Sequence, residues 1–422
     1  MNVLLVGSGG REHALAWKLK RSPLLRELHC APGNAGIAQL ATCHDVSAED
    51  VPGLLALARG LAADLTVVGP EAPLVAGIVD EFTANGLRVF GPTKAAAVLE
   101  GSKSFCRELL ERHSIPSAKY AVFTEPGPAL RYVREQGAPI VVKADGLAAG
   151  KGAIVCESVG QAEAAIRQIL VDRAFGEAGD RLVVEECLQG PELSLIAFSD
   201  GKTVSPMVPS QDHKRAGERD TGPNTGGMGC YSPVPLVTPE VFEQAVVEVL
   251  NPTVAAMAAA GRLYKGVLYA GLMLTATGPR VLEFNARFGD PETQVILPRL
   301  ESDLLEIMLA VVDGKLDTLS PKWSERVAVC VVVASGGYPG SYEKGNALSG
   351  LEEAEKLADV TVFHAGTARK DGQVVTAGGR VLGVTALGDD FPAAIRRAYE
   401  GVDRITFEGA YCRRDIARRA LQ

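Results

Sequence analysis

Short apolar segments alternate with helical segments through the first hundred residues, and this alternation constrains the fold more than any other feature. The segments VLLVG (residues 3–7), DLTVV (64–68) and LRVFG (87–91) predict strands. Helical patterns between them cover residues 11–20 and 54–61. Strands that alternate with helices in this way form parallel sheets. The chain is therefore predicted to begin with an α/β domain.

Two further regions follow. A helical stretch over residues 94–110 places a boundary near residue 101. Residues 210–235 are polar and rich in Gly and Pro, so they are predicted to lack regular structure. From about residue 326, several short strands precede a final helix that ends in the basic segment RRDIARRALQ.

The composition excludes several classes of protein. Of 422 residues, 47% are hydrophobic and 22% are charged, as in globular proteins and unlike disordered chains or fibres. A net charge of −8 offers no basic surface to nucleic acid or to an anionic membrane. No apolar run approaches the roughly 20 residues that span a bilayer. The eight scattered cysteines, without a CxxC pair, indicate reduced thiols and a cytoplasmic protein.

Glycine is in excess: the 46 glycines are about 11% of the chain, against a typical 7%. The first cluster, residues 7–12 (GSGGRE), lies between a predicted strand and a predicted helix. A dinucleotide-binding fingerprint would need Gly where Glu12 stands, which disfavours a nicotinamide-dependent dehydrogenase. A phosphate could bind the glycine backbone, the helix N-terminus and Arg11. A tight turn without a ligand explains this cluster equally well.

A second cluster, KADGLAAGKG over residues 143–152, lies between two predicted strands. It is not a P-loop, because only three residues separate Gly146 from Gly150, and Gly rather than Ser or Thr follows Lys151. A glycine-rich loop with lysines at both ends can close over polyphosphate, as a kinase loop covers ATP. This favours a phosphate site over an exposed hairpin.

A third cluster lies in residues 211–229, which contain QDHKR and TGPNTGGMG. A long segment of this kind is usually functional or disordered. Its Asp, Lys, Arg and Asn beside glycines favour a small polar substrate. Structural hydrogen bonds, rather than catalysis, are expected for His213 here and for His364 further along the chain.

The stretch VLEFNARFGDPE, residues 281–292, predicts a strand with functional side chains. Residues two apart in a strand share a face, so Glu283, Asn285 and Arg287 should point one way, with Leu282 and the alternate apolar residues opposite. Two oxygen ligands and a guanidinium fit Mg²⁺ and a transferring phosphoryl group. A half-exposed strand with a surface ion pair would show the same pattern. The two loops that carry Gly and Lys favour the phosphate site.

Together these segments resemble the glycinamide ribonucleotide synthetase family, ATP-grasp enzymes of de novo purine synthesis. The resemblance is carried by GSGGREHALAW, APGNAG, VGPEAPLVAG, GPTKAAAVLEGSK, KADGLAAGKG, SQDHKRAGERDTGPNTGGMG and LEFNARFGDPETQ, and towards the C-terminus by SGGYPG, VFHAGT and GGRVLGVTALG. It covers essentially the whole chain.

The resemblance implies an α/β fold, α+β in part, with three domains. An ATP-grasp core, residues 102–325 with a small lobe at about 120–192, would lie between an N-terminal parallel-sheet domain (1–101) and a small β-rich C-terminal domain (326–422). It also implies a monomer whose partners are small molecules, namely ATP, glycine and phosphoribosylamine, together with Mg²⁺ or Mn²⁺.

The resemblance further implies roles for individual residues. Glu283 and Asn285 match the family's metal ligands. The residues implied to bind ATP are Lys103, Lys143, Gly146, Gly150, Lys151, Gly152, Glu185, Leu188 and Glu192. Among them, Glu185 would read the adenine edge and Glu192 would hold the ribose hydroxyls. The residues implied to bind the other substrates are Gly9, Gly10, Arg11, Glu71, Asp212, Lys214, Asn224, Arg287, Pro291 and Glu292. Those implied to act in catalysis are Arg287, Lys143 and Asp290.

The implied reaction converts the carboxylate of glycine into glycyl phosphate, which an amine then attacks. Arg287 would hold the acyl phosphate, Asp290 or Asp212 the ammonium group of glycine, and the first glycine cluster the ribose 5-phosphate. The alternatives are another ATP-grasp ligase or carboxylase that acts on a different acid, and a non-catalytic nucleotide-binding regulator.

Overall fold

The N-terminal part of the chain forms a five-stranded sheet in the order β3-β2-β1-β4-β5, in which every pair of neighbours is parallel. The computed structural model describes residues 1–148 and 152–421. The strands are β1 (Asn2–Gly7), β2 (Glu27–Pro32), β3 (Thr42–Cys43), β4 (Leu65–Val68) and β5 (Val89–Phe90). The helices around them are α1 (Gly10–Leu19), α2 (Val51–Gly60), α3 (Glu71–Ala76), α4 (Ile78–Ala84) and α5 (Lys94–Gly101). The predicted parallel sheet is confirmed.

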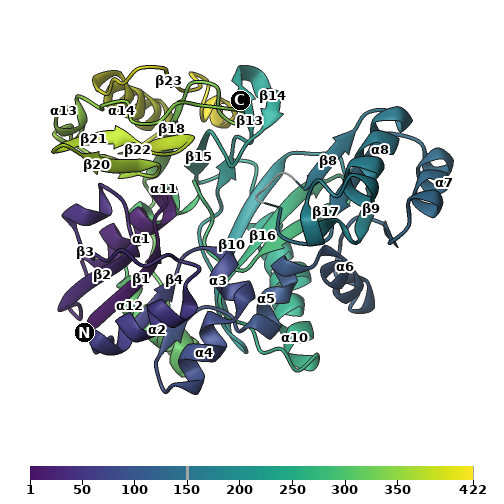
Figure 1. The fold of residues 1–422 in the computed structure, drawn as a ribbon, viewed down its shortest axis with the longest axis horizontal. Coiled ribbons are helices and arrows are strands. Elements are labelled where there is room, and N and C mark those ends of the chain that lie inside the picture. Colours follow the sequence, from purple (N-terminus) through teal and green to yellow (C-terminus); the bar gives the residue numbers. More distant parts are fainter. Residues whose placement is uncertain (149–151, 422) are drawn as a thin grey trace.

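A separate antiparallel sheet in the order β6-β9-β7-β8 lies on the right in Figure 1 and carries its own hydrophobic core. Its strands are β6 (Tyr120–Phe123), β7 (Ile140–Ala144), β8 (Ala153–Cys156) and β9 (Leu182–Glu186), and its helices are α7 (Pro126–Gln136) and α8 (Val159–Ile166). We call this unit the small lobe. The residues between β7 and β8 belong to the second glycine cluster.

A larger antiparallel sheet in the order β11-β10-β16-β17 lies beside the small lobe. Its strands are β10 (Glu192–Asp200), β11 (Val204–Pro206), β16 (Lys265–Thr275) and β17 (Gly278–Asn285). The helices near it are α6 (Lys103–Arg112), α9 (Pro239–Ala245), α10 (Asn251–Ala259) and α12 (Leu304–Asp313). Helix α12 contacts both this sheet and β5, so it joins the central and N-terminal parts.

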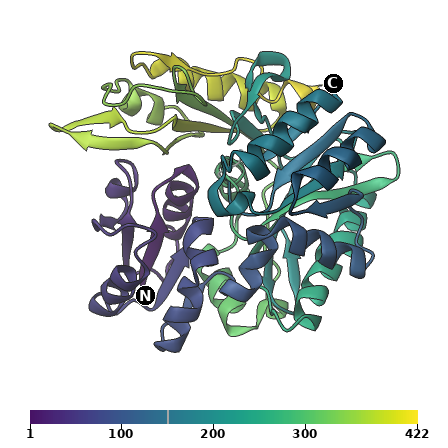
Figure 2. The ribbon, with the colours of Figure 1, turned by 45° about the vertical axis from the view of Figure 1, so that its right-hand side comes forward.

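The C-terminal sheet has six strands and includes residues from the middle of the chain. Its main path is β12-β15-β18-β22-β19, and β23 pairs with β18. The strands are β12 (Gln211–Asp212), β15 (Gly229–Ser232), β18 (Val327–Ser335), β19 (Val360–His364), β22 (Arg380–Gly388) and β23 (Ala410–Tyr411). Two further hairpin strands are β20 (Thr367–Lys370) and β21 (Gln373–Thr376), and the remaining helices are α11 (Thr293–Ile296), α13 (Leu351–Glu355) and α14 (Phe391–Arg404). Helix α14 packs on β18 and β22 (Figure 2).

The N-terminal and C-terminal parts meet through buried histidines. The backbone N–H of His364 donates to Nδ1 of His13 at 2.7 Å, and Nδ1 of His364 lies 3.1 Å from Oγ1 of Thr367. The structural hydrogen bond expected for His364 is therefore present. His213 differs, because neither of its ring nitrogens has a hydrogen-bond partner within the described part of the chain.

Two expectations about secondary structure were wrong. The segment predicted to lack regular structure forms β12, β15 and a hairpin of β13 (Arg215–Gly217) with β14 (Thr221–Asn224). The last α-helix ends at Arg404, and the basic tail forms only a short 3₁₀ turn, Arg418–Leu421. Contacts between these two segments explain both differences.

The guanidinium of Arg413 joins the tail to the hairpin. Its Nε and Nη2 donate to Asp415 at 2.8 Å each, and its Nη1 donates to Asp220 and to the carbonyl of Arg215 at 3.1 and 3.0 Å. The side chain is 1% exposed. Tertiary ion pairs therefore override the local helical pattern of the tail.

None of the helices in the described ranges is long and apolar enough to cross a membrane.

We expect Arg413→Met to lower the free energy of unfolding by about 3 kcal/mol, because it removes the cation from a buried ion cluster. Arg414→Met is the matched control. Arg414 pairs with Asp403 at 2.6 Å, but these side chains are 52% and 58% exposed, and exposed pairs contribute about 0–1 kcal/mol. Urea unfolding measures both variants. Equal losses would contradict the anchoring role of Arg413.

Candidate active site

A cavity of about 340 Å³ lies between the small lobe and the central sheet. This volume falls within the usual range for ligand pockets of roughly 300–1,000 Å³. The charged residues that line it are Glu71, Glu100, Lys103, Arg107, Lys143, Glu185, Glu186, Glu192, Asp212, Lys214, Glu283, Arg287, Asp290 and Glu292. Residues from the N-terminal part, the small lobe, the central sheet and the third glycine cluster therefore converge on one site.

The functional face of β17 is arranged as its alternation predicts. Glu283, Asn285 and Arg287 all line the cavity, and Nη2 of Arg287 donates to Oδ1 of Asn285 at 3.3 Å. Val281 and Phe284 belong to the hydrophobic core. Burial acts to raise the pKa of Glu283, but Lys214, Lys143 and Lys103 outweigh it and hold that pKa below its usual value. Glu283 is thus an anion surrounded by cations.

Leu282 departs from the predicted alternation. Gly271 of β16 pairs with Glu283, but the next residue, Leu272, pairs with Val281. Leu282 is therefore the extra residue of a β-bulge, which shifts the side-chain alternation locally. It is half-buried and lines the cavity, so the prediction that it faces the core with Phe284 was wrong.

Arg287 lies between two carboxylates from the N-terminal part of the chain. Its Nε is 3.0 Å from Oε2 of Glu71, and its Nη2 is 3.6 Å from Oε1 of Glu100. Oε2 of Glu100 also accepts from the backbone N–H of Ala286 at 2.7 Å. Burial raises the pKa of Glu100 to about 7, against the opposing effect of Arg287. Arg287 thus pairs with carboxylates from the N-terminal part of the chain on its side of the cavity.

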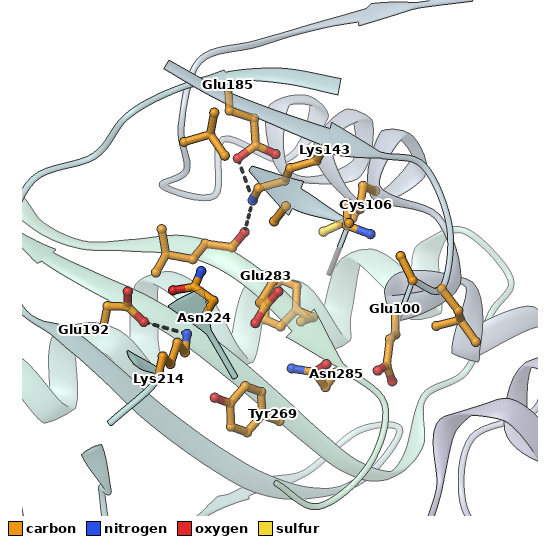
Figure 3. Close-up of a pocket in the computed structure, with 18 of the residues that line it drawn as sticks. Glu100, Cys106, Lys143, Glu185, Glu192, Lys214, Asn224, Tyr269, Glu283 and Asn285 are labelled. Atoms are coloured by element: carbon orange, nitrogen blue, oxygen red, sulfur yellow. Dashed lines mark hydrogen bonds and ion pairs between the residues drawn. The ribbon is translucent and has the colours of Figure 1, made fainter. Parts of the chain in front are cut away.

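A buried ion network links the two lobes. Nζ of Lys143 lies 2.8 Å from Oε2 of Glu185, and Arg107 donates from Nε and Nη2 to the two oxygens of the same carboxylate at 2.7 Å each. Lys143 also donates to the carbonyl of Leu282 at 3.0 Å (Figure 3). Both oxygens of Glu185 are bonded to cations. The contact with the adenine edge that the resemblance implies for Glu185 stays a prediction.

The second glycine cluster is fixed at its start by α6. Nζ of Lys103 donates to the carbonyl of Gly146 at 2.8 Å, and Asp145 accepts from the backbone N–H and the hydroxyl of Ser104 at 3.0 and 2.6 Å. Gly146 has a φ of +152°, and a Cβ there would lie 2.7 Å from Cβ of Ala178, so both the backbone conformation and the space require glycine. Gly146 and Gly152 line the cavity, whereas Gly150 and Lys151 lie outside the described residues.

The segment between β9 and β10 and the start of β10 form another side of the cavity, which Leu188 and Glu192 line. The carboxylate of Glu192 lies 2.5 Å from Nζ of Lys214 (Figure 3). Asn224 lines the cavity next to this pair.

A second group of acidic residues lies near Lys214. Oε1 of Glu292 accepts from the hydroxyls of Ser194 and Tyr269, both at 3.1 Å. Burial, opposed by Lys214 and reinforced by Glu292, raises the pKa of Asp212 to about 7. Asp212 is thus a buried carboxyl group whose pKa is close to neutral pH.

The first glycine cluster lies beside the cavity rather than in it. Glu12 accepts from the N–H of Gly9 at 2.6 Å and from Nε of Arg11 at 2.5 Å, and Nη1 of Arg11 donates to the carbonyl of Phe288 at 3.2 Å. The N–H of Arg11 also donates to Oδ2 of Asp290 at 3.3 Å. Carboxylates therefore already occupy the N-terminus of α1, where a phosphate was one expectation.

Asp290 connects α1 to the C-terminal sheet. Its Oδ1 accepts from Nε2 of Gln294 at 2.8 Å and lies 3.4 Å from Nη2 of Arg380. Pro291 follows Asp290 and packs against Gly227 of the third glycine cluster, where a Cβ would lie 2.5 Å from Cδ of Pro291. Gly10 also lies nearby, because a Cβ there would reach Nε2 of Gln294 at 2.6 Å.

Sequence reasoning missed Arg107, Glu100 and Tyr269. Arg107 could have been found, since in α6 it stands one turn from Ser104 and from Leu110, both buried. A charged residue on the buried face of an amphipathic helix needs a partner. Glu100 and Tyr269 carry no comparable signal, because their partners come from distant segments.

Family models agree with the site. Models described as the N, ATP-grasp (A) and C domains of phosphoribosylglycinamide synthetase match residues 1–100, 101–293 and 328–419. The phosphoribosylamine–glycine ligase of Vibrio vulnificus is 56% identical over 424 aligned residues, which cover 100% of this chain and 99% of that protein. The chain belongs to the phosphoribosylglycinamide synthetase family.

Two further phosphoribosylamine–glycine ligases are also similar to this chain over nearly its whole length. A phosphoribosylamine–glycine ligase of Escherichia coli is 55% identical over 426 residues, covering 100% of this chain and 99% of that protein. The crystal structure of the Thermotoga maritima enzyme of that name matches with a TM-score of 0.87 and 33% identity, covering 98% of this chain and 100% of that chain. The predicted ATP-grasp fold is confirmed, and so is the prediction that the chain is a ligase of this family.

A more distant structure shares the fold alone. Biotin carboxylase from Campylobacter jejuni matches with a TM-score of 0.75 at 16% identity, covering 97% of this chain and 92% of that chain. The layout of sheets is therefore shared with a protein that is only distantly similar in sequence.

We expect Glu292→Gln to lower the pKa of Asp212, because it removes a negative charge that raises this pKa. Carboxyl ¹³C NMR titration, with Asp212→Asn to assign the signal, measures the change. Glu240→Gln, on an exposed part of α9, is the control and should leave the titration unchanged. An unchanged or raised pKa in Glu292→Gln would show that the two carboxylates do not interact.

Proposed function

We propose that this chain joins glycine to 5-phosphoribosylamine and cleaves ATP to ADP and phosphate, giving glycinamide ribonucleotide. The full-length similarity to phosphoribosylamine–glycine ligases supports these substrates. The observation that carries the proposal is the cavity itself, which Lys103 and Lys143 line together with Glu283 and Asn285 of β17 and with Arg287 just after that strand. We further propose a cytoplasmic monomer that binds small molecules and neither nucleic acid nor a membrane, in keeping with the acidic composition.

ATP would lie between the small lobe and the central sheet. Lys103 and Lys143 would contact its phosphates, and the second glycine cluster, including Gly150 and Lys151, would close over them. The backbone of residues 185–188 would contact the adenine edge, since the carboxylate of Glu185 is bonded to Arg107 and Lys143. Glu192 would hold the ribose hydroxyls after it leaves Lys214.

The donor set of the site fits a divalent cation. A carboxylate and an amide, Glu283 and Asn285, stand side by side on β17, and carboxylates outnumber Lys and Arg among the described residues that line the cavity. Hard oxygen ligands of this kind suit Mg²⁺ or Mn²⁺, with phosphate oxygens and water as further ligands. Such an ion would neutralise charge on the triphosphate.

In the first step, an oxygen of the glycine carboxylate attacks the γ-phosphorus of ATP, and ADP leaves. The step brings negative charges together, so it depends on fixed cations more than on an acid or base. Lys143 and Arg287 would supply that charge. Asp290 is already bonded to Arg11 and Gln294, so we assign the ammonium group of glycine to Asp212, with Glu292 close by.

In the second step, the amine of phosphoribosylamine attacks the acyl carbon, phosphate leaves and the nitrogen loses one proton. Arg287 would hold the departing phosphate, with Glu71, Lys214, Asn224 and Pro291 around the joined substrates. The ribose 5-phosphate would bind beside Gly9, Gly10 and Arg11, and Arg11 would exchange its bond with Glu12 for one with the phosphate. Closure of the glycine cluster would exclude the water that hydrolyses acyl phosphates.

The experiment that tests the function is a coupled assay of ADP release. We expect release to require both glycine and phosphoribosylamine, with bicarbonate or formate unable to replace glycine. ADP release driven equally well by bicarbonate would instead assign the chain to a different ATP-grasp activity. ATP binding without glycine-dependent turnover would support a nucleotide-binding regulator.

We expect Glu283→Gln to reduce kcat at least about 100-fold and to raise the Mg²⁺ concentration needed for half-maximal activity, because an amide is a weaker ligand than a carboxylate. Glu186→Gln is the control. Glu186 also lines the cavity, but its carboxylate lies 3.4 Å from Nη1 of Arg280. Because this pair does not involve Glu283 or Asn285, the Mg²⁺ dependence of Glu186→Gln should stay normal. A normal Mg²⁺ dependence in Glu283→Gln would remove this residue from the metal site.

A further inference from the structure

Arg107 has no role in any of the steps above, yet it is bonded to two of the elements that form the cavity. It lies on α6, and its side chain is 2% exposed. Nε and Nη2 bind both oxygens of Glu185 on β9, while Nη1 and Nη2 donate to the carbonyls of Val281 and Leu282 on β17 at 3.0 and 2.7 Å. One guanidinium therefore ties the small lobe to the strand that carries Glu283.

The geometry uses the fork of a guanidinium. Two parallel hydrogen bonds to one carboxylate, with two more to carbonyls, need the planar set of five N–H donors that arginine provides. A lysine ammonium has three donors on one atom and cannot span the carboxylate and both carbonyls. Burial acts to lower the pKa of Arg107, but Glu185 outweighs it and raises that pKa, so the side chain stays charged.

Lys143 binds two of the three groups that accept from Arg107, namely the Glu185 carboxylate and the carbonyl of Leu282. It lies 2.8 Å from Oε2 of Glu185 and donates to the carbonyl of Leu282 at 3.0 Å. Two cations thus neutralise a single buried anion, and one positive charge is left over on the cavity side. Without Arg107, Lys143 would be the one ion-pair partner left to the buried Glu185 carboxylate among the described residues, and separating that pair would be costly.

We propose that Arg107 is a positioning residue for ATP binding: it neutralises Glu185 so that Lys143 is available to the phosphates, and it holds the bulge at Leu282 so that Glu283 faces the cavity. This rests on the proposed function only in placing ATP phosphates beside Lys143. It assigns Arg107 no contact with a substrate.

The test compares Arg107→Met, Arg107→Lys and the double variant Arg107→Met/Glu185→Gln with Arg112→Met, an exposed control at the end of the same helix. Isothermal titration measures ATP affinity, and steady-state kinetics give KM for ATP and for glycine. Thermal unfolding confirms that each variant is folded at the assay temperature.

We expect Arg107→Met to weaken ATP binding at least about tenfold, because Lys143 is then held by Glu185, with KM for glycine changed less than about threefold. The double variant should recover most of the ATP affinity, because the neutral amide that replaces the Glu185 carboxylate no longer holds Lys143. Arg107→Lys should fall in between, and Arg112→Met should match the unaltered protein. Unchanged ATP affinity in Arg107→Met or in Arg107→Lys overturns the proposal.

A purely structural role gives a different pattern. It predicts a lower unfolding temperature and less active protein, with the KM for ATP unchanged, and that result overturns the proposal. If Arg107→Met does not fold, the test uses Arg107→Lys and the double variant. A double variant that binds ATP more weakly than Arg107→Lys would contradict the proposal. The variants could show the expected order of ATP affinities while the protein shows no glycine-dependent ADP release. That result would contradict the proposed function and still support the role of Arg107.

Discussion

The cavity depends on the neutralisation of one buried carboxylate, that of Glu185. Arg107 binds both of its oxygens and Lys143 binds one, and all three side chains are less than a tenth exposed. Burying an ion is costly unless its partners satisfy it completely, so these residues can only be stable together. The three residues come from α6, β7 and β9, and Arg107 and Lys143 also donate to carbonyls of β17. The ion network therefore connects the small lobe to the central sheet.

The rest of the site repeats this principle on the other side of the cavity. Arg287 is held between Glu71 and Glu100, and Lys214 is paired with Glu192. Each cation is already oriented by a protein carboxylate before an anionic substrate arrives. Such preorganised charge stabilises developing negative charge without reorganisation during the reaction. Carboxylates outnumber Lys and Arg among the described residues that line the cavity.

Local patterns in the sequence predicted what depends on local geometry. The alternation of Glu283, Asn285 and Arg287 follows from the two-residue repeat of a strand, and the N-terminal parallel sheet follows from alternating strands and helices. Leu282 did not follow this pattern, because the bulge depends on the pairing of Glu283 with Gly271 and of Val281 with Leu272 on the neighbouring strand β16. The contact between Glu185 and Arg107 could not be predicted from a local pattern, because 78 residues separate the two.

Long-range hydrogen bonds account for the other differences. The hairpin of β13 and β14 forms in a segment expected to be irregular because Arg413, nearly 200 residues further on, binds the carbonyl of Arg215. The same contact keeps the basic tail from continuing as a helix. Glu100 was missed for this reason as well, because its contact with Ala286 joins residues 186 positions apart.

The central claim is that this cavity transfers the γ-phosphoryl group of ATP to the carboxylate of glycine. Glycine labelled with ¹⁸O in both carboxylate oxygens tests it most directly, since the attacking oxygen stays with phosphorus when the amine displaces phosphate. Mass spectrometry of the released phosphate should show one ¹⁸O atom per molecule formed. Phosphate without ¹⁸O would show that glycine never attacks the γ-phosphorus, and would contradict the account.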